Sequence, residues 1–411
     1  MKNTGTRFVL FLNYFVFAVL LNTVGAVILQ VQQSFGATKS SAALLEGFKD
    51  LPIAIGSFLL ASLIPKMGYK KSMLLGLGIV SITCFFMPFA DAIWYFKLLF
   101  FMVGVSFALI KVSVFSTIGL VTDSQKEHSS LMSLIEGVFM VGILCGNILF
   151  SLFTNDNEPQ SRNWLNVYWV LGSLSLLAFV VLLFTEIDQS KIQNELSKSS
   201  LTDDFATMLK IAIKPLVLIF ILSIAFYVLI EQSFQTWMPT FYKEILKVPA
   251  SMSIQAGAVL AGAFALGRFG AGFILQKIHW LPMVAICLIC SAACVLIVIP
   301  MAQNTTLTEN ITWLNAPLVV YVFPLLGIFL APIYPAINSL ILNSLPKHQH
   351  SAMSGLIVVF SALGGTTGSI ITGNVFEHFS GSTAFMLSIV PMAILGILLF
   401  FFNRKMTSEN A

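Results

Sequence analysis

The sequence predicts an all-α integral membrane protein with twelve transmembrane helices in two pseudo-symmetric six-helix bundles. Its composition, its recurring apolar segments and a repeat between its halves predict this class. Hydrophobic residues make up 57% and charged residues 10% of the 411, and the mean hydropathy is +0.91. Because a soluble domain carries about 25% charged residues, the chain is predicted to be polytopic. The net charge of +4 has a topological cause, given below, and does not indicate nucleic-acid binding.

Apolar segments of about 20 residues, long enough to cross a bilayer, recur along the whole chain. They cover residues 7–30, 41–64, 72–91, 96–120, 130–153, 164–185, 213–242, 250–275, 281–301, 314–342, 351–375 and 381–403. The longest hydrophilic stretch, residues 186–214, divides them into six and six. We therefore expect an N-terminal bundle at 1–187, a cytoplasmic linker at 188–212 and a C-terminal bundle at 213–411.

The distribution of Lys and Arg predicts the orientation. With both termini cytoplasmic, fourteen of these residues lie on the cytoplasmic side, five on the outer side and three within spans, which accounts for all 22. Such an excess marks the cytoplasmic side. The N-terminal segment has no small-residue cleavage site, so it is predicted to be a membrane helix and not a signal peptide. We expect a multi-pass, monomeric protein of the bacterial cytoplasmic (inner) membrane with both termini in the cytoplasm.

The two halves resemble each other. At an offset of 211 residues, Gly56 and Lys66 align with Gly267 and Lys277. Repeated halves are typical of transporters whose substrate site lies between them near the bilayer midplane. The chain contains no nucleophile triad, nucleotide-binding loop or metal-ligand spacing. It is therefore predicted not to be an enzyme and to need no cofactor or metal.

Three charges interrupt the second apolar segment, LLEGFKDLPIAIGSF. If this helix begins near Ser41, Asp50 lies about 13 Å inside the hydrocarbon, with Glu46 one turn away on the same face and Lys49 beside them. Two carboxylates in such a place do not both ionise cheaply, so one is expected to exchange a proton. The alternative is that Lys49 and Asp50 form an ion pair that only fixes helix packing.

Other spans also carry charges. Lys111 and Glu136 are predicted at similar depths on neighbouring helices, where a pair would be either a switch or a permanent bridge. Glu231 lies in the seventh span, and Arg268 lies near the inner end of the eighth, where its side chain could extend to the interface. The candidates for proton coupling are Glu46, Asp50, Glu136 and Glu231.

The seventh span combines aromatic, amide and carboxylate side chains in the stretch YVLIEQSFQTWMP. Tyr227, Glu231 and Gln235 share one helical face, and Gln232 and Trp237 lie beside it. Rings next to amides suit a hydroxylated or amphipathic ligand; alternatively, Trp237 belongs to an interfacial aromatic belt. The following proline, at position 239, is expected to break the helix near its outer end and to act as a gate hinge. The candidates for substrate binding are Lys49, Lys111, Tyr227, Gln232, Gln235, Trp237, Asn22 and Asn338.

The turn after the second span resembles the signature of the major facilitator superfamily, G-x-x-x-D-R-x-G-R-K. The equivalent run here, Ala61 to Lys71, reads ASLIPKMGYKK, and a weaker copy ends at Gln276 to His279. Pro65 and Gln276 replace the aspartate of the signature. The lead-in to this turn, together with GIFLAPIYPAINSL and SALGGTTGSIITG, is most similar to the fucose, galactose and glucose proton symporters, in which the seventh helix also contributes to the central site.

This resemblance implies a secondary active transporter that moves a small polar solute by alternating access. We expect proton-coupled symport, with a sugar as the first candidate solute and sodium as the alternative coupling ion. Two other functions remain open. One is a proton-coupled antiporter that exports a drug, metabolite or siderophore, and the other is a carrier of an anionic or zwitterionic solute. The expected partners are the solute, the coupling ion and the lipid bilayer, and no nucleic acid.

Overall fold

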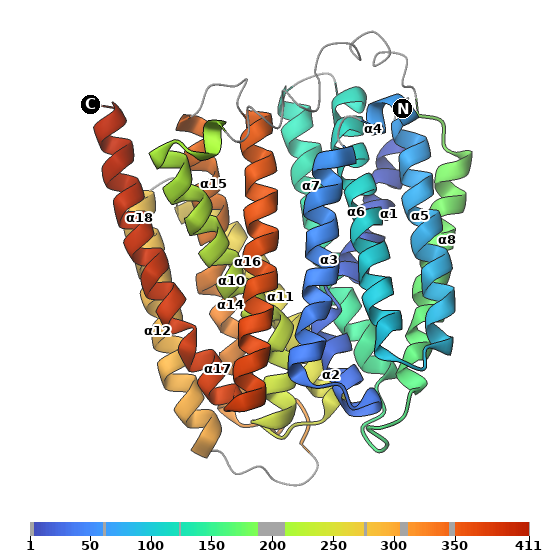
Figure 1. Cartoon of the computed structure of the whole chain (residues 1–411), viewed down its shortest axis with the longest axis vertical. Coiled ribbons are helices and arrows are strands. Elements are labelled where there is room, and N and C mark those ends of the chain that lie inside the picture. The colour runs from blue at the N-terminus through green and yellow to red at the C-terminus, as the bar shows by residue number, and fades with distance from the viewer. Residues whose placement is uncertain are drawn as a thin grey trace.

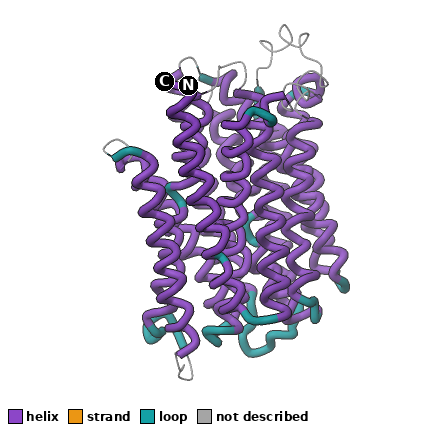
Figure 2. Tube along the Cα trace, turned by 60° about the vertical axis from the view of Figure 1, so that its left-hand side comes forward, coloured by secondary structure: helices purple, strands orange, loops and turns teal. Residues whose placement is uncertain are grey.

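The computed structural model describes residues 4–60, 63–122, 125–187, 210–274, 278–304, 311–344 and 350–410. Every regular element in these ranges is a helix (Figure 2). The first helix begins and the last helix ends on the same side of the molecule, at the top of Figure 1. We call this the terminal side and the opposite one the distal side.

Two bundles of helices lie side by side (Figure 1). The N-terminal bundle contains α1 (Thr4–Leu21), α2 (Val24–Phe35), α3 (Lys39–Leu60), α4 (Leu63–Met67), α5 (Tyr69–Phe86), η1 (Met87–Phe89), α6 (Ile93–Val121), α7 (Gln125–Phe153), η2 (Asn163–Asn166) and α8 (Val167–Phe184). The C-terminal bundle contains α10 (Pro215–Glu244), α11 (Ala250–Ile274), α12 (Trp280–Asn304), α13 (Leu318–Val322), η3 (Phe323–Leu325), α14 (Leu326–Leu330), α15 (Ile333–Ser344), α16 (His350–His378), α17 (Gly381–Leu387) and α18 (Ile389–Asn410).

Eleven stretches of the described residues are long and apolar enough to cross a membrane. Helix α3 has a comparable length of 22 residues, but Glu46, Lys49 and Asp50 interrupt its apolar character. Counted with α3, the helices match the twelve predicted spans. The first span is broken at Asn22 and Thr23, where α1 gives way to α2.

Proline affects the spans in different ways. The predicted span 314–342 is divided into α13, η3, α14 and α15, and Pro324 and Pro332 lie at these divisions, since proline cannot donate the helical hydrogen bond. The expected break of the seventh span at Pro239 is wrong, because α10 continues through it to Glu244. Phe241, in the next turn, is fully buried and packs against Phe323, with ring centroids 5.0 Å apart. This packing holds the helix beyond the proline.

The helices of the two bundles repeat in the same order. The first residues of α1 and α10, of α3 and α11, and of α5 and α12 are each 211 residues apart, whereas those of α7 and α16 are 225 apart. The C-terminal bundle therefore has a longer connection after α12. The predicted linker lies almost entirely outside the described residues, so the boundaries at 187 and 213 remain predictions. Of the signature turn, residues 61–62 and 275–277 also lie outside them.

Helices of the two bundles pack against each other along a junction. The most extensive contacts are those of α3 with α16, of α7 with α11 and of α2 with α10, and α2 also contacts α11. Figure 1 shows α3 and α16 side by side along the junction. The predicted polar residues of α3 and α10 therefore lie where the two bundles meet.

Candidate functional site

The three charges of α3 form one cluster, in which Asp50 is half-buried. Glu46 is completely buried, and Lys49 is 6% exposed. The Lys49 ammonium forms ion pairs with Glu46 and, at 3.4 Å, with Asp50 Oδ1. Removing a charge from water is costly unless a partner compensates it, and here one cation lies between two carboxylates. The described charged groups that interact with Asp50 are Lys49 and Glu46.

The cluster is hydrogen-bonded to the other bundle. Gln232 Nε2 of α10 donates to Glu46 Oε1 at 2.8 Å, and Thr236 Oγ1, one turn further along α10, donates to Glu46 Oε2 at 3.0 Å. Asp50 Oδ2 faces α16 at Gly365, where an added Cβ would come within 2.8 Å of it. Both oxygens of Glu46 are therefore bonded across the junction, and the second carboxylate lies against the backbone of α16.

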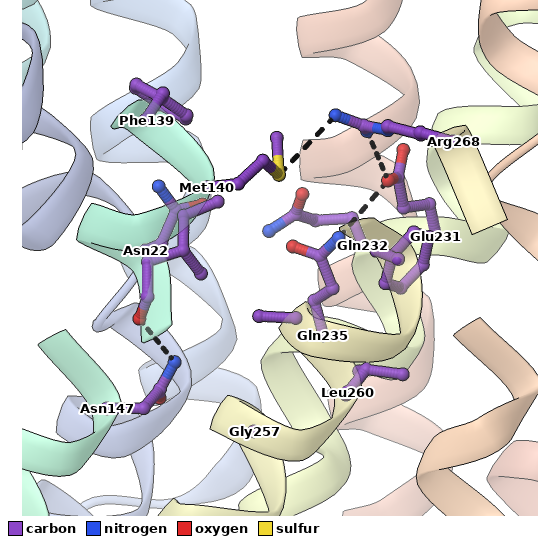
Figure 3. Close-up of a pocket in the computed structure, with 13 residues that line it drawn as sticks. Asn22, Phe139, Met140, Asn147, Glu231, Gln232, Gln235, Gly257, Leu260 and Arg268 are labelled. Atoms are coloured by element: carbon purple, nitrogen blue, oxygen red, sulfur yellow. Dashed lines mark hydrogen bonds and ion pairs between the residues drawn. The ribbon is translucent and has the colours of Figure 1, made fainter. Parts of the chain in front are cut away.

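A cavity lies beside this cluster, between the bundles. It has a volume of about 180 Å³ and is lined by Asn22, Phe139, Met140, Ile143, Asn147, Glu231, Gln232, Gln235, Gly257, Leu260, Ala261, Phe264 and Arg268. Figure 3 shows side chains of both bundles pointing toward one another across it. Of the predicted candidates, the structure brings together Asn22, Glu231, Gln232 and Gln235 in this wall. The volume is below the 300–1,000 Å³ typical of sites for drug-sized ligands, so the cavity suits a small solute.

An ion pair forms part of the cavity wall. Arg268 Nη2 of α11 lies 3.2 Å from Glu231 Oε1 of α10, and Gln235 Nε2 donates to the same oxygen at 3.2 Å. Arg268 Nη1 reaches the N-terminal bundle at Met140 Sδ, 3.8 Å away (Figure 3). Arg268 is absent from the candidates predicted from the sequence, which placed it near the membrane interface. The sequence signal that could have identified this pair is Glu231, an acid at a matching depth on the preceding helix.

Lys111 and Glu136 lie apart from the cavity lining. The Lys111 ammonium lies 5.9 Å from the centre of the Phe107 ring and interacts with Glu136. Glu136 also interacts with Tyr14 and with Arg268 of the other bundle. Within the described ranges, no ion pair closer than 4.0 Å joins Lys111 to Glu136. Glu136 is thus placed between cations of both bundles.

Three further candidates do not line the cavity. Trp237 is fully buried; its indole nitrogen donates to the Ser369 carbonyl oxygen at 3.1 Å. Tyr227 is fully buried and contacts the Tyr334 ring, with centroids 5.6 Å apart. Asn338 lies one turn beyond Tyr334 on α15 and interacts with its hydroxyl. No group of three His, Cys, Asp or Glu side chains in the described part of the chain could hold a metal ion.

On the distal side, each bundle caps a helix of the other. The Ser40 amide, in the first turn of α3, donates to Glu377 Oε2 of α16 at 2.6 Å. The Ser251 amide, in the first turn of α11, donates at 3.0 Å to Asp156 Oδ1, just beyond α7. An anion at a helix N-terminus is favourable. An ion pair of 3.1 Å between Lys39 and a glutamate at the end of α10 also joins the bundles on this side. Polar contacts therefore join the two bundles on the distal side.

Comparisons with known proteins identify the same architecture. A TsgA homologue of Buchnera aphidicola subsp. Acyrthosiphon pisum is 22% identical over 407 residues, 98% of this chain and 97% of the relative. A bacterial homologue of the human lysosomal transporter Spinster, in an inward-facing and occupied conformation, superposes with a TM-score of 0.75 at 15% identity, covering 97% of this chain and 96% of that one. The transporter FucP, in the outward conformation, superposes with a TM-score of 0.62 at 16% identity, covering 98% and 99%.

A sequence profile gives the family directly. The Major Facilitator Superfamily profile matches residues 8–323 and 306–411, nearly the whole chain. Its match agrees with the twelve helices in two repeated bundles and with a polar cavity between them. This multi-pass membrane protein therefore belongs to the Major Facilitator Superfamily and is a secondary transporter.

Proposed function

We propose that the protein is a proton-coupled symporter of a small, neutral, hydroxylated solute, with a sugar as the first candidate. The observation that carries the proposal is the position of the charge cluster. Glu46 and Lys49 lie buried, and Asp50 half-buried, at the junction of the bundles, next to a polar cavity. One cation between two carboxylates within a membrane protein is an arrangement that can accept and release a proton as its surroundings change.

The cavity wall supports the choice of solute. The side chains of Asn22, Asn147, Gln232 and Gln235 offer amide donors and acceptors, and Phe139 and Phe264 supply apolar surface. Amides bond hydroxyl groups while rings cover the apolar face of a sugar. The ion pair in the wall adds no net charge. The sequence resemblance to fucose, galactose and glucose proton symporters supports the same class.

The polar contacts between the bundles on the distal side support alternating access. Hydrogen bonds between the bundles on that side must break before the cavity can open there. The predicted excess of Lys and Arg makes the terminal side cytoplasmic. We therefore place the described conformation at the stage in which the cavity is sealed from the outside, in a monomer of the bacterial cytoplasmic membrane.

A second candidate is a carrier of an anionic solute. The Arg268 guanidinium makes one bond to Glu231 and one to a thioether, and no described residue accepts from its Nε. A guanidinium has five N–H donors, so a carboxylate could use the remaining ones. Export by proton antiport is distinguished from symport by the sign of the proton movement.

The test is solute-induced pH change in proteoliposomes. A panel of L-fucose, D-galactose, D-glucose, D-gluconate, L-alanine and dialanine is added to vesicles without a buffer gradient. External alkalinisation with a neutral sugar, lost in Asp50→Asn and retained in the exposed-loop control Glu158→Gln, is the expected result. Alkalinisation only with gluconate establishes the anionic class. External acidification indicates antiport, and solute movement without proton flux in wild type and both variants would overturn proton coupling.

A further inference from the structure

Gln232 belongs to both the charge cluster and the cavity. Its Nε2 donates to Glu46 Oε1 at 2.8 Å and to Thr236 Oγ1 at 3.0 Å. Its side chain also forms part of the cavity wall (Figure 3). Since the two acceptors use both amide hydrogens, its carboxamide oxygen is the group left for a solute hydroxyl. Thr236 and Gln235, on the same helix, each contact only one of the two, the cluster or the cavity.

Two neighbouring residues make this difference testable. Thr236 donates to Glu46 Oε2 at 3.0 Å but is 1% exposed and does not line the cavity. Gln235 lines the cavity, but its Nε2 donates to Glu231, in its own helix. Thus Thr236 contacts the cluster alone, Gln235 contacts the cavity alone, and Gln232 contacts both.

We propose that Gln232 transmits solute binding to the α3 charge cluster; this inference rests on the proposed function. Its bond to Glu46 joins α10 of one bundle to α3 of the other, so the bundles cannot separate here without breaking it. A solute hydroxyl that engages the carboxamide gives Gln232 another partner and makes that separation easier. Separation leaves the buried Glu46 short of a donor, which is unfavourable, so the bundles stay joined unless a solute bound to the carboxamide draws Gln232 toward the cavity and weakens this bond. Reorientation therefore depends on the solute.

The other groups around Glu46 fit this role. Lys49 and Asp50 are the charged neighbours on its own helix. From α10 it receives two uncharged donors, Gln232 and Thr236. Helix α16 contributes Gly365 next to Asp50. The bonds from α10 are thus the ones that a change of conformation can remove while the Lys49 pair stays within α3.

The first experiment measures conformation and needs no solute. Spin labels are placed at Asp91→Cys and Leu314→Cys, two exposed distal positions in different bundles, after serine replaces the five native cysteines. Distances are measured by electron–electron resonance in proteoliposomes. In Gln232→Ala and Thr236→Val, the population with an open distal side is expected to rise about tenfold, as expected for loss of a hydrogen bond to a charged group. Gln235→Ala is expected to match wild type.

The second experiment measures proton leak, also without solute. Vesicles containing the dye pyranine are given a membrane potential with potassium and valinomycin. Gln232→Ala is expected to pass protons at least fivefold faster than wild type, while Gln235→Ala does not. The double variant Gln232→Ala with Asp50→Asn is expected to lose this leak.

Three outcomes would overturn the proposal. In one, Gln232→Ala leaves the distal distances of wild type. In another, Gln235→Ala changes the distal distances as much as Gln232→Ala does, which would mean that any change in the cavity wall has this effect. In the third, the distal side opens in Gln232→Ala without any leak, so that the bond joins the bundles but does not couple them to protons. Failure of the proposed function differs from all three, because the solute panel then moves no protons in wild type.

Discussion

Helices α3 and α11 are the second spans of their bundles, yet they meet the opposite bundle in different ways. At the 211-residue offset, Glu46, Lys49 and Asp50 of α3 correspond to Gly257, Leu260 and Ala261 of α11. The three α3 residues form the charge cluster. All three α11 residues line the cavity.

The difference shows how two repeated bundles form a site that is not symmetric between them. On the α3 side, charged side chains occupy the junction, and Glu46 accepts hydrogen bonds from α10. On the α11 side, a glycine, a leucine and an alanine leave space for the cavity. Arg268, about two turns beyond the alanine, contributes its guanidinium to the wall. The same backbone repeat thus supplies a cluster on one side of the junction and a cavity on the other.

The largest effect is expected from removing the cluster's only cation. Lys49→Met leaves two carboxylates without a compensating charge, and breaking a buried pair in this way costs about 3–5 kcal/mol of unfolding free energy. The matched change at the corresponding position, Leu260→Met, conserves volume and is expected to cost less than about 1.5 kcal/mol. Unfolding by SDS titration in mixed micelles, followed by tryptophan fluorescence, measures both.

Equal losses at these two positions would contradict the comparison, because the cluster would then contribute no more than ordinary packing. Adding Glu46→Gln and Asp50→Asn to Lys49→Met removes the charges together. Most of the lost stability is expected to return, although transport does not. This triple variant separates the role of the charges in stability from their role in coupling.

A smaller effect is expected where a glycine contacts each of these helices. An added Cβ at Gly104 of α6 would overlap the Lys49 carbonyl oxygen, whereas one at Gly327 of α14 would lie 3.1 Å from the corresponding oxygen of Leu260. Gly104→Ala must displace α3 and is expected to cost about 1–3 kcal/mol. Gly327→Ala needs a shift of only a few tenths of an ångström and is expected to cost less. The same SDS titration ranks them, and a larger loss in Gly327→Ala would refute the ordering.

The smallest effect is expected at the distal caps, where the bundles are most alike. Glu377→Gln and Asp156→Asn each remove a carboxylate from the N-terminus of α3 or α11. Each is expected to raise the population with an open distal side about twofold to fivefold, since such surface interactions are weak. The spin-label pair at positions 91 and 314 reports the change. A shift with only one of the two variants would show that the caps are not equivalent.

Much of the fold was predictable from the sequence because apolar length and the repeat are local signals. The charges of α3 were identifiable for the same reason, since each is out of place within an apolar span. The Arg268 pair was not predicted, because it depends on how α10 and α11 pack. Trp237 illustrates the reverse case: its spacing suggested the substrate site, but the packing of α10 against α16 directs its indole to Ser369. Periodicity gives a helix face only approximately, and tertiary packing decides which neighbour that face meets.

The break in the first span has a mechanical consequence. Asn22 Nδ2 donates to the Ala18 carbonyl at 2.9 Å, and Thr23 Oγ1 donates to that of Leu20 at 3.2 Å, so the two side chains at the interruption satisfy two of the backbone acceptors at the end of α1. Helix α1 packs within its own bundle against α6, α7 and α8, while α2 packs against α10 of the other bundle as well as α3 of its own. The first span therefore consists of two helical segments that meet at the level of the cavity, and its distal segment touches both bundles. We expect this segment to change its angle to α1 when the bundles move apart.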